Sequence, residues 1–322
     1  MVKIRFGVIG CGYIAKKTFI PALKKSSYAE LVAVASRDKN IAKSFSIEFG
    51  CNYEKNYETL LSRDDLDAVY IATIPSTHEE FILMSAKYGK HILCEKPLTT
   101  SYNSAKKIVS YCKNSNVGIL EGFMYQYHTQ HKYVTDFIKK GNIGKPILFE
   151  AKFGFPPLEE DNYRYQKING GGSLLDAGVY TIHSARNFFQ KEPREVFSVL
   201  NYEKNKADIN GSVLMDFGNN QMAQLSFGFD NYYQNNYQIW CTRGVIRVNR
   251  AFSIPPNQVP QVSIEMQNEH IAKELEPCDQ FERQIAFFVK GLKKLKTKEM
   301  WYKDITAQSE ILHKIIKNKE NV

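Results

Sequence analysis

The sequence predicts an α/β protein of two domains: a doubly wound parallel sheet at the N-terminus, then an α+β domain built on a largely antiparallel sheet. Strand and helix patterns alternate from residue 3 to residue 120, and hairpin-like pairs of strands follow residue 147. The length of 322 residues also exceeds the size at which a single hydrophobic core keeps growing. We therefore expect one domain over residues 1–122 and a second over residues 123–322.

Each strand of the first domain is predicted by a short apolar run, with a helical pattern before the next run. The runs lie at residues 3–9, 31–35, 68–72, 91–94 and 117–120, and helical patterns lie at residues 38–49, 77–88 and 101–114 and from a glycine-rich turn to Leu23. This order predicts a parallel sheet with right-handed crossovers. Pro21 should kink or interrupt the first helix, because proline has no backbone N–H to donate.

The second domain is predicted from turn signals between strand-like segments. Residues 212–217 and 221–229 flank Gly218-Asn219-Asn220, while residues 236–241 and 245–248 flank Thr242-Arg243-Gly244. Both arrangements are typical of β-hairpins. Near the C-terminus, apolar residues recur every three or four positions, which predicts a helix packed on the core. These residues are Phe281, Ile285, Phe288, Leu292 and Leu295.

Composition and charge argue against several classes of protein. The formal net charge is +9, but the lysines are spread along the chain, which indicates a solvated surface and no nucleic-acid partner. No apolar run approaches the roughly 18 residues of a membrane span, and the N-terminus lacks the apolar core of a secretion signal, so we expect a cytoplasmic protein without a membrane partner. The cysteines show no paired spacing, which argues against a disulfide framework and a zinc cluster, and we expect no metal. They are Cys11, Cys51, Cys94, Cys112, Cys241 and Cys278.

A glycine-rich turn between the first strand and the first helix predicts a dinucleotide site. Gly10-x-Gly12-x-x-Ala15 stands where the dinucleotide-binding fingerprint requires it. Gly10 permits the tight turn, Gly12 lets the backbone approach a pyrophosphate, and Ala15 lets helix and strand pack closely. The helix N-terminus offers unpaired N–H groups to the anion, so Tyr13 and Ile14 are cofactor-binding candidates. A structural turn without a ligand is the alternative.

The end of the second strand bears on the choice between the two nicotinamide cofactors. An acidic residue there suits the ribose 2′-hydroxyl of NAD, whereas an arginine suits the 2′-phosphate of NADP. This strand ends in Ser36-Arg37-Asp38. We predict that Ser36 and Arg37 bind the phosphate of NADP, while Asp38 keeps NAD possible.

Two further segments carry groups suited to catalysis. Cys94-Glu95-Lys96-Pro97 follows the fourth strand, at the edge of the sheet where ligands of such folds bind, and Pro97 biases Lys96 toward an extended backbone. If residues 174–188 form an α-helix, Asp176, Tyr180 and His183 lie at i, i+4 and i+7 on one face. A surface lysine and an ordinary amphipathic helix are the alternatives.

Together these motifs resemble the family of glucose-fructose oxidoreductase, inositol dehydrogenase and the rhizopine-catabolism proteins (Gfo/Idh/MocA), over nearly the whole chain. The further marks of the resemblance are Ala72-Thr73-Ile74-Pro75 with His78, Glu95-Lys96-Pro97, residues 141–146 and the segment from Gly170-Gly171-Gly172 to Tyr180. It implies a Rossmann domain that binds NAD(P), a second domain that binds substrate, and a homodimer or homotetramer formed through the exposed face of the antiparallel sheet.

The resemblance also implies roles for individual residues. Lys96, Asp176 and Tyr180 would be catalytic. The cofactor would meet Thr73, Ile74, Pro75, His78, Glu95 and Lys96 besides the residues named above. The substrate would meet Arg164, Asp176, Tyr180, His183 and Tyr125, the last of which lies in the crossover between the domains. Tyrosine at position 180 resembles the branch of glucose-fructose oxidoreductase, dihydrodiol and xylose dehydrogenases, and sugar-nucleotide 3-ketoreductases.

The chemistry of these residues agrees with hydride transfer. Reduction of a ketone builds negative charge on its oxygen, and a positioned donor must neutralise that charge or supply a proton. A free tyrosine has a pKa of about 10, and a neighbouring ammonium favours its phenolate, so Lys96 beside Tyr180 would form a proton relay, with Asp176 as a ligand of substrate hydroxyls. We predict an NADP(H)-dependent oxidoreductase of a sugar or nucleotide-linked sugar. The alternatives are a dihydrodiol or aldose (xylose-type) dehydrogenase and a non-catalytic NAD(P)-binding regulator.

Overall fold

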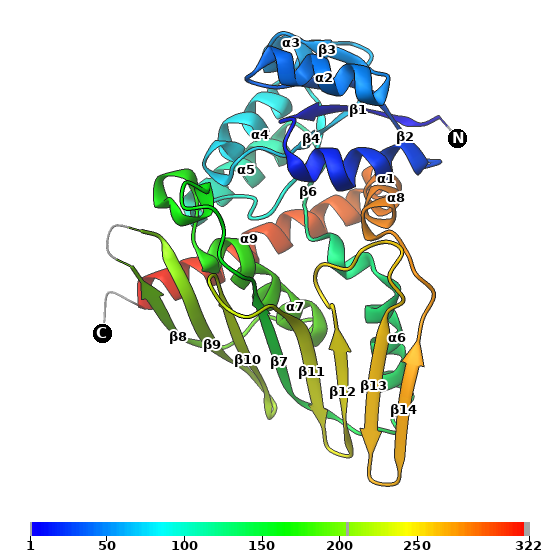
Figure 1. Cartoon of the computed structure of the whole chain (residues 1–322), viewed down its shortest axis with the longest axis vertical. Coiled ribbons are helices and arrows are strands. Elements are labelled where there is room, and N and C mark those ends of the chain that lie inside the picture. The colour runs from blue at the N-terminus through cyan, green and yellow to red at the C-terminus, as the bar shows by residue number, and fades with distance from the viewer. Residues whose placement is uncertain (1, 204–205, 319–322) are drawn as a thin grey trace. The chain divides into compact units, whose positions relative to one another are not determined.

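The structure is a computed structural model that describes residues 2–203 and 206–318 (Figure 1). The chain forms two compact units. Among the described residues, unit 1 holds those up to Phe123 together with Phe281–Ser309, and unit 2 holds those of Met124–Gln280 together with Glu310–Asn318. The sequence predicted a single division at residue 122. In the structure, the C-terminal segment 281–309 also belongs to unit 1. No helix in the described ranges has the length and hydropathy that crossing a bilayer requires.

Unit 1 is a six-stranded parallel sheet in the order β3-β2-β1-β4-β5-β6. The strands are β1 (Ile4–Ile9), β2 (Ala29–Ala35), β3 (Asn52–Glu54), β4 (Ala68–Ile71), β5 (His91–Cys94) and β6 (Ile119–Glu121). The helices are α1 (Ile20–Lys25), α2 (Lys39–Phe49), α3 (Tyr57–Leu61), α4 (His78–Lys87), α5 (Tyr102–Asn114), α8 (Gln280–Leu292) and the part of α9 (Leu295–Asn318) that ends at Ser309. The predicted doubly wound sheet is confirmed, and the strand order reverses between β1 and β4.

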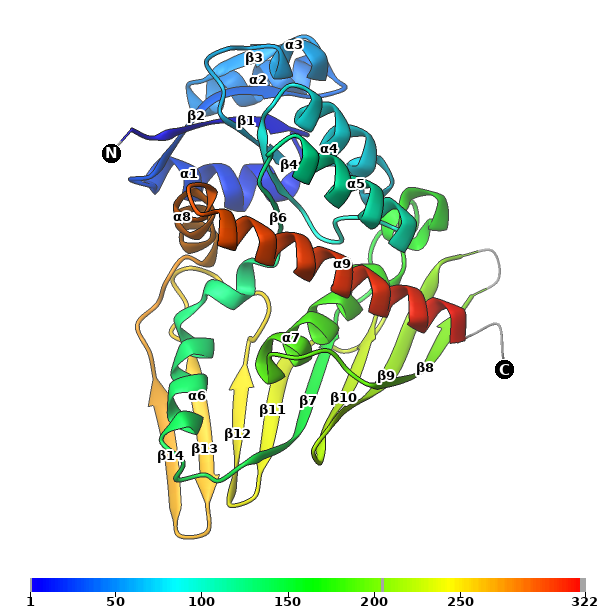
Figure 2. The ribbon, with the colours of Figure 1, turned by 180° about the vertical axis from the view of Figure 1, so that it is seen from behind.

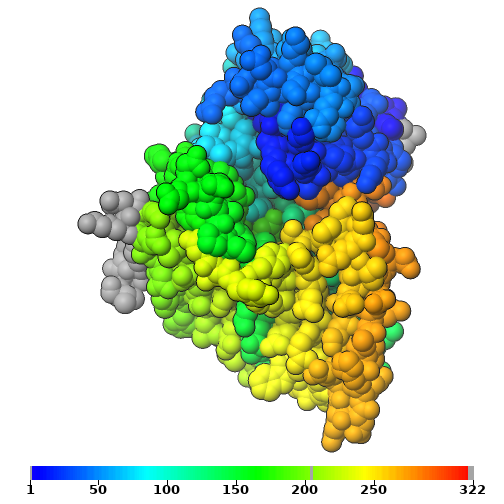
Figure 3. Space-filling view, in the orientation of Figure 1, coloured from blue at the N-terminus to red at the C-terminus, as the bar shows by residue number. Residues whose placement is uncertain are grey.

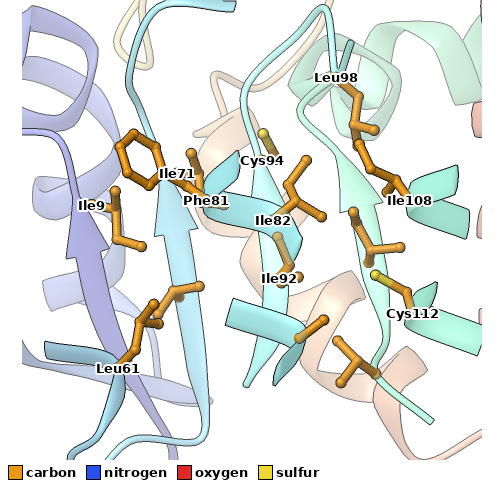
Figure 4. Close-up of a cluster of buried hydrophobic side chains, with 14 of the residues drawn as sticks. Ile9, Leu61, Ile71, Phe81, Ile82, Ile92, Cys94, Leu98, Ile108 and Cys112 are labelled. Atoms are coloured by element: carbon orange, nitrogen blue, oxygen red, sulfur yellow. The ribbon is translucent and has the colours of Figure 1, made fainter. Parts of the chain in front are cut away.

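Both faces of this sheet are buried, because successive residues of a strand point to opposite sides. On one face, Ile71 and its neighbours pack with side chains of α3, α4 and α5 (Figure 4). On the other face, Tyr70 stacks on Phe19 with ring centroids 3.5 Å apart. Tyr302 and Ile305 of α9 join the first cluster, so the C-terminal segment completes a core that starts more than 200 residues earlier.

The first helix changes type at the position where proline was expected to interrupt it. Residues Ala15–Phe19 form a π-helical turn, and α1 follows with Pro21 in its first turn. The wider turn suits the missing N–H of Pro21, which cannot close an α-helical bond to the preceding turn.

The predicted C-terminal stripe divides between two helices. Phe281, Ile285, Phe288 and Leu292 are buried on α8, as expected. Leu295 is 68% exposed, because α8 ends at Leu292 and Leu295 begins α9. The expectation that Leu295 packs in the core was therefore wrong.

Unit 2 is an eight-stranded sheet in the order β14-β13-β12-β11-β7-β10-β9-β8, antiparallel except between β7 and β10. The predicted largely antiparallel sheet and both predicted hairpins, β9–β10 and β11–β12, are confirmed. The strands are β7 (Pro146–Gly154), β8 (Glu195–Tyr202), β9 (Asp208–Gly218), β10 (Gln221–Gly228), β11 (Gln234–Cys241), β12 (Gly244–Asn249), β13 (Gln261–Met266) and β14 (Glu269–Glu274).

One face of this sheet is covered by helices and the other is open. The helices α6 (Thr129–Lys139) and α7 (Val179–Phe189) lie on the same face, behind the sheet in Figure 1 and in front of it in Figure 2. The connection from β7 to α7 runs over the surface of unit 2 and includes the bright green segment of Figure 3. That connection and α7 carry most of the residues predicted to bind substrate.

Candidate active site

The glycine-rich turn has the backbone that its sequence predicts. Gly10 has a φ of +97°, and a Cβ there would lie 2.9 Å from the carbonyl oxygen of Ala72. At Gly12 a Cβ would meet nothing closer than 3.8 Å, so the backbone beside it is open to a ligand. Ala15 is fully buried, and Tyr13 is 78% exposed. The turn follows β1 at the reversal of strand order, so these residues fit a bound dinucleotide.

The end of β2 presents Arg37 to solvent and engages Asp38 locally. Ser36 is half-buried and Arg37 is exposed. Asp38 is the N-cap of α2, where its Oδ1 accepts a hydrogen bond of 2.8 Å from the backbone N–H of Asn40. Asp38, the acidic residue that keeps NAD possible, therefore already accepts a hydrogen bond as the N-cap of α2.

Tyr57, which the sequence did not single out, also lies near Arg37 in unit 1. Burial raises the pKa of its phenol, and a hydrogen bond with the backbone of Arg37 opposes that rise. Its ring packs edge-on against Phe81, with centroids 4.6 Å apart. The signal that could have located it is Asn56, whose side chain accepts a hydrogen bond from the N–H of Thr59 and so begins α3.

The turn that carries Lys96 is held by buried polar groups of neighbouring strands. The hydroxyl of Tyr70 donates to Glu95 Oε1 at 2.5 Å, and the N–H of Leu98 donates to Glu121 Oε1 at 2.8 Å. Lys96 itself is half-buried, and its peptide bond to Pro97 is cis. Fixed at residues 95 and 98, the turn presents the lysine at the carboxyl edge of the sheet.

His78, for which a cofactor contact was predicted, is buried against two backbone segments of unit 1. The ring is fully buried, with Nδ1 2.9 Å from the carbonyl oxygen of Pro97 and Nε2 3.1 Å from that of Thr73. Burial lowers the pKa of His78, so the ring is neutral near pH 7 and donates to one of these carbonyls. We therefore assign His78 to positioning two segments of the site. The other expected contacts, Thr73, Ile74, Pro75 and Glu95, remain predictions.

The helix expected over residues 174–188 begins with a different geometry. Leu174–Gly178 form a π-helical turn, and α7 starts at Val179. The spacing argument that put Asp176 and Tyr180 on one α-helical face therefore does not apply to the first turn. Tertiary contacts decide where these two side chains point.

Asp176 is ion-paired with Arg164, which comes from the surface connection. Arg164 Nε lies 2.8 Å from Asp176 Oδ2, and the aspartate side chain is only 13% exposed. Burial acts to lower the pKa of Arg164, but Asp176 and the nearby phenols of Tyr163 and Tyr180 raise it above its ordinary value. The guanidinium thus stays charged and holds the carboxylate in place.

Tyr180 is buried among aromatic side chains of unit 2. Its ring centroid lies 5.2 Å from that of Phe153 and 5.9 Å from those of Tyr125 and Phe252. Its hydroxyl lies 3.5 Å from the sulfur of Met124, a weak acceptor. The phenol is therefore placed precisely by apolar neighbours.

His183 is joined to Tyr125 on the same side of α7. Its Nδ1 lies 2.6 Å from the Tyr125 hydroxyl, and the ring of Tyr125 also contacts that of Tyr180. Unit 2 thus gathers all the predicted substrate-binding residues into two contacting sets, Tyr125 with Tyr180 and His183, and Arg164 with Asp176. Met124, Phe153 and Phe252 contact Tyr180 but were missed, because buried apolar side chains look like ordinary core residues in a sequence.

The fold and these residues define a dinucleotide-dependent oxidoreductase. Residues 4–123 match the family model for the oxidoreductase family with an NAD-binding Rossmann fold, and residues 131–247 match that for the GFO/IDH/MocA C-terminal domain. The chain belongs to the Gfo/Idh/MocA family of oxidoreductases, as the resemblance predicted.

The chain is similar to two characterised family members and to one solved structure. It is 36% identical over 310 residues to dTDP-3,4-didehydro-2,6-dideoxy-α-D-glucose 3-reductase of Actinomadura kijaniata. The alignment covers 96% of this chain and 93% of the relative. It is 28% identical over 289 residues to D-xylose 1-dehydrogenase (NADP⁺) 2 of Haloferax volcanii, covering 89% and 88% of the two chains. The crystal structure of the 3-ketoreductase KijD10 from Actinomadura kijaniata, in complex with NADP and TDP-benzene, matches with a TM-score of 0.93 at 35% identity over 98% of each chain.

Proposed function

We propose that this chain is an NADP(H)-dependent oxidoreductase that reduces a ring ketone of a nucleotide-linked sugar. The observation that carries the proposal is the set of ionisable groups on and beside α7, where Tyr180 is packed against apolar rings and Asp176 is held by Arg164. A protein that only senses the cofactor needs the glycine turn but not this set. The similarity to a dTDP-sugar 3-reductase and to a structure with NADP and TDP-benzene supports the choice of substrate class and cofactor.

The residues that would hold the dinucleotide lie on unit 1. Gly10 allows the tight turn, Gly12 leaves the backbone open to the pyrophosphate, the N–H groups of Tyr13 and Ile14 face it, and Ser36 and Arg37 bind the 2′-phosphate. Thr73, Ile74 and Pro75 follow β4, the neighbour of β1 at the switch point. Bound NADPH supplies the hydride for the reduction.

The chain's own groups handle the proton and the substrate. We assign Tyr180 as the acid that protonates the ketone oxygen and Lys96 as the ammonium that stabilises negative charge on the same oxygen. Asp176, oriented by Arg164, accepts hydrogen bonds from a ring hydroxyl. His183 and Tyr125 shape the pocket beside Tyr180 and limit the ring substituents that fit.

The test is NADPH oxidation, followed by absorbance, against a panel of substrates. We expect turnover with dTDP-linked keto sugars, and little with free keto sugars. The alternative, an aldose or dihydrodiol dehydrogenase, would instead reduce NADP⁺ with free xylose or a dihydrodiol, in line with the similarity to xylose dehydrogenase. A chain that binds NADPH tightly but turns over no member of the panel in either direction would be a regulator, which contradicts the proposal.

Arg37→Ala is expected to change the choice of cofactor. Loss of a charge-assisted bond to the 2′-phosphate should weaken NADPH binding by roughly 10- to 100-fold while leaving NADH binding unchanged. Both dissociation constants can be measured by fluorescence titration. Lys43→Ala removes another exposed cation, on α2, and is the matched control. An unchanged NADPH/NADH ratio in Arg37→Ala would remove Arg37 from the phosphate site.

We also propose that the chain forms a homodimer or homotetramer through the open face of the unit 2 sheet. Large apolar side chains stand exposed on that face, with Phe197 at 59%, Val199 at 66% and Trp240 at 54%. Exposed apolar side chains on one face of a sheet favour burial against a partner. Light scattering of the purified chain would test this. All six cysteines are unpaired in the structure, which suits the cytoplasmic location we propose.

A further inference from the structure

Asp208 is a buried carboxylate that binds the start of the helix bearing Asp176 and Tyr180. It opens β9 and is 8% exposed. Its Oδ2 accepts hydrogen bonds from the hydroxyl of Ser173 at 2.7 Å and from the backbone N–H of Leu174 at 2.6 Å. Leu174 is the first residue of the π-helical turn, so the contact is made at the helix N-terminus.

This contact replaces a local helix cap. Ser173 stands at the N-cap position, but its side chain makes no capping hydrogen bond and donates to Asp208 instead. The oxygen that satisfies the N–H of Leu174 therefore comes from a strand 34 residues further along the chain. A negative charge at this end of the helix is also favoured by the helix dipole.

The adjacent glycines are required by the same contact. Gly172 has a φ of +121°, and a Cβ there would lie 2.3 Å from Asp208 Oδ1. At Gly171 a Cβ would lie 2.5 Å from the carbonyl oxygens of Tyr163 and Arg164. The N–H of Gly172 donates to the carbonyl oxygen of Arg164 at 2.8 Å. The glycines thus let the helix start approach both Asp208 and the segment that supplies Arg164 to Asp176.

Hydrogen bonds offset part of the cost of burying the carboxylate of Asp208. Burial raises the pKa of Asp208, while its bonds from Leu174 and Ser173 oppose that rise. An uncharged residue at this position would avoid the desolvation cost. We therefore take the hydrogen bonds to the start of the helix to be the contribution of the carboxylate to the structure.

We propose that Asp208 is a positioning residue of the active site, which fixes the first turn of the catalytic helix and thereby the direction of Asp176 and Tyr180. The inference rests on the proposed function for its effect on turnover, but the contact itself can be tested without a substrate. Released from Asp208, the π-helical turn would fray first, because the N–H groups of a first turn have no partner within the helix. Asp176 lies within that turn, and Tyr180 follows directly after it.

The experiment compares Asp208→Ala with Asp208→Asn and Ser173→Ala. The alanine variant should lower kcat by on the order of 10- to 100-fold and raise the KM for the sugar, because small displacements of reacting groups are costly. Its NADPH dissociation constant should stay within twofold, since the residues assigned to the cofactor lie on unit 1. The asparagine variant keeps one oxygen for both bonds and should restore most of kcat. Ser173→Ala keeps the bond from Leu174 and should lose only a few-fold.

Hydrogen–deuterium exchange provides the readout that needs no substrate. Peptides covering residues 172–180 should exchange faster in Asp208→Ala than in the wild type or Asp208→Asn, while peptides of α8 should be unchanged. Wild-type exchange in Asp208→Ala would overturn the contact, and faster exchange with wild-type kcat would overturn its role in catalysis. Equal loss of kcat in the alanine and asparagine variants, without a change in exchange, would also overturn it. A wild type that reduces no sugar would fail the proposed function alone, and the exchange result would still stand.

Discussion

Tyr180→Phe is expected to lower kcat by roughly 10²- to 10⁴-fold, the range found when a positioned acid is removed. The substitution deletes one hydroxyl and leaves the ring in its pocket between Phe153, Tyr125 and Phe252. The fold should therefore be preserved, and the NADPH dissociation constant should not change. Steady-state kinetics with the sugar substrate identified by the panel would measure the loss.

The matched control for this substitution is Tyr237→Phe. Tyr237 is another buried tyrosine of unit 2, whose hydroxyl lies 3.0 Å from Nδ1 of His131. Loss of that hydroxyl should leave kcat close to the wild-type value. A fully active Tyr180→Phe enzyme would remove the phenol from the mechanism and leave the proton source unassigned.

Lys96→Met should reduce kcat by roughly 10²- to 10³-fold, because it removes the positive charge that we propose stabilises the oxygen on which negative charge develops. Methionine keeps most of the side-chain length, and the turn remains held through Glu95 and Leu98. The loss should therefore appear in kcat more than in stability, as measured by thermal unfolding. Lys107→Met, which removes an exposed lysine paired with Glu79, is the control and should be silent.

The double variant Lys96→Met/Tyr180→Phe tests whether the two groups serve one proton-transfer step. Residues that act as a unit are strongly non-additive, so the double variant should lose little more than the worse single variant. Losses that multiply would show that the ammonium and the phenol act in separate steps. That result would contradict the assignment of both groups to the same oxygen.

The glycine turn and the alternating strands of unit 1 were predictable because their signals are local. A tight β-α turn needs glycine at position 10 for its φ of +97°, and parallel strands buried on both faces need short apolar runs. Within residues 1–122 the missed elements β3 and α3 are three and five residues long, too short for periodicity to show. Hairpins β9–β10 and β11–β12 were predictable for a similar reason, since their turn residues adjoin their strands.

The site was predictable as a set of residues but not as an arrangement. Motifs identified Lys96, Asp176 and Tyr180, yet the α-helical spacing used for the last two was wrong for a π-helical first turn. His78 was expected at the cofactor, and the structure shows it fully buried, with its ring nitrogens beside the carbonyl oxygens of Pro97 and Thr73. Nothing near these positions in the sequence reports either fact, because each depends on which backbone carbonyl or carboxylate packs against the residue in the fold.

Local sequence therefore determines the class of this protein: the order of strands and helices, the open turn for a dinucleotide, and the presence of an amine, a carboxylate and a phenol. These features rest on backbone sterics and on the periodicity of apolar residues, which act between neighbours in the chain. Only the tertiary structure decides that α8 and part of α9 complete unit 1, that Arg164 holds Asp176, and that Asp208 caps a helix 34 residues before it. Those contacts form between segments distant in sequence. Many polar residues of the chain could make similar contacts, and strand pairing and burial determine which of them do.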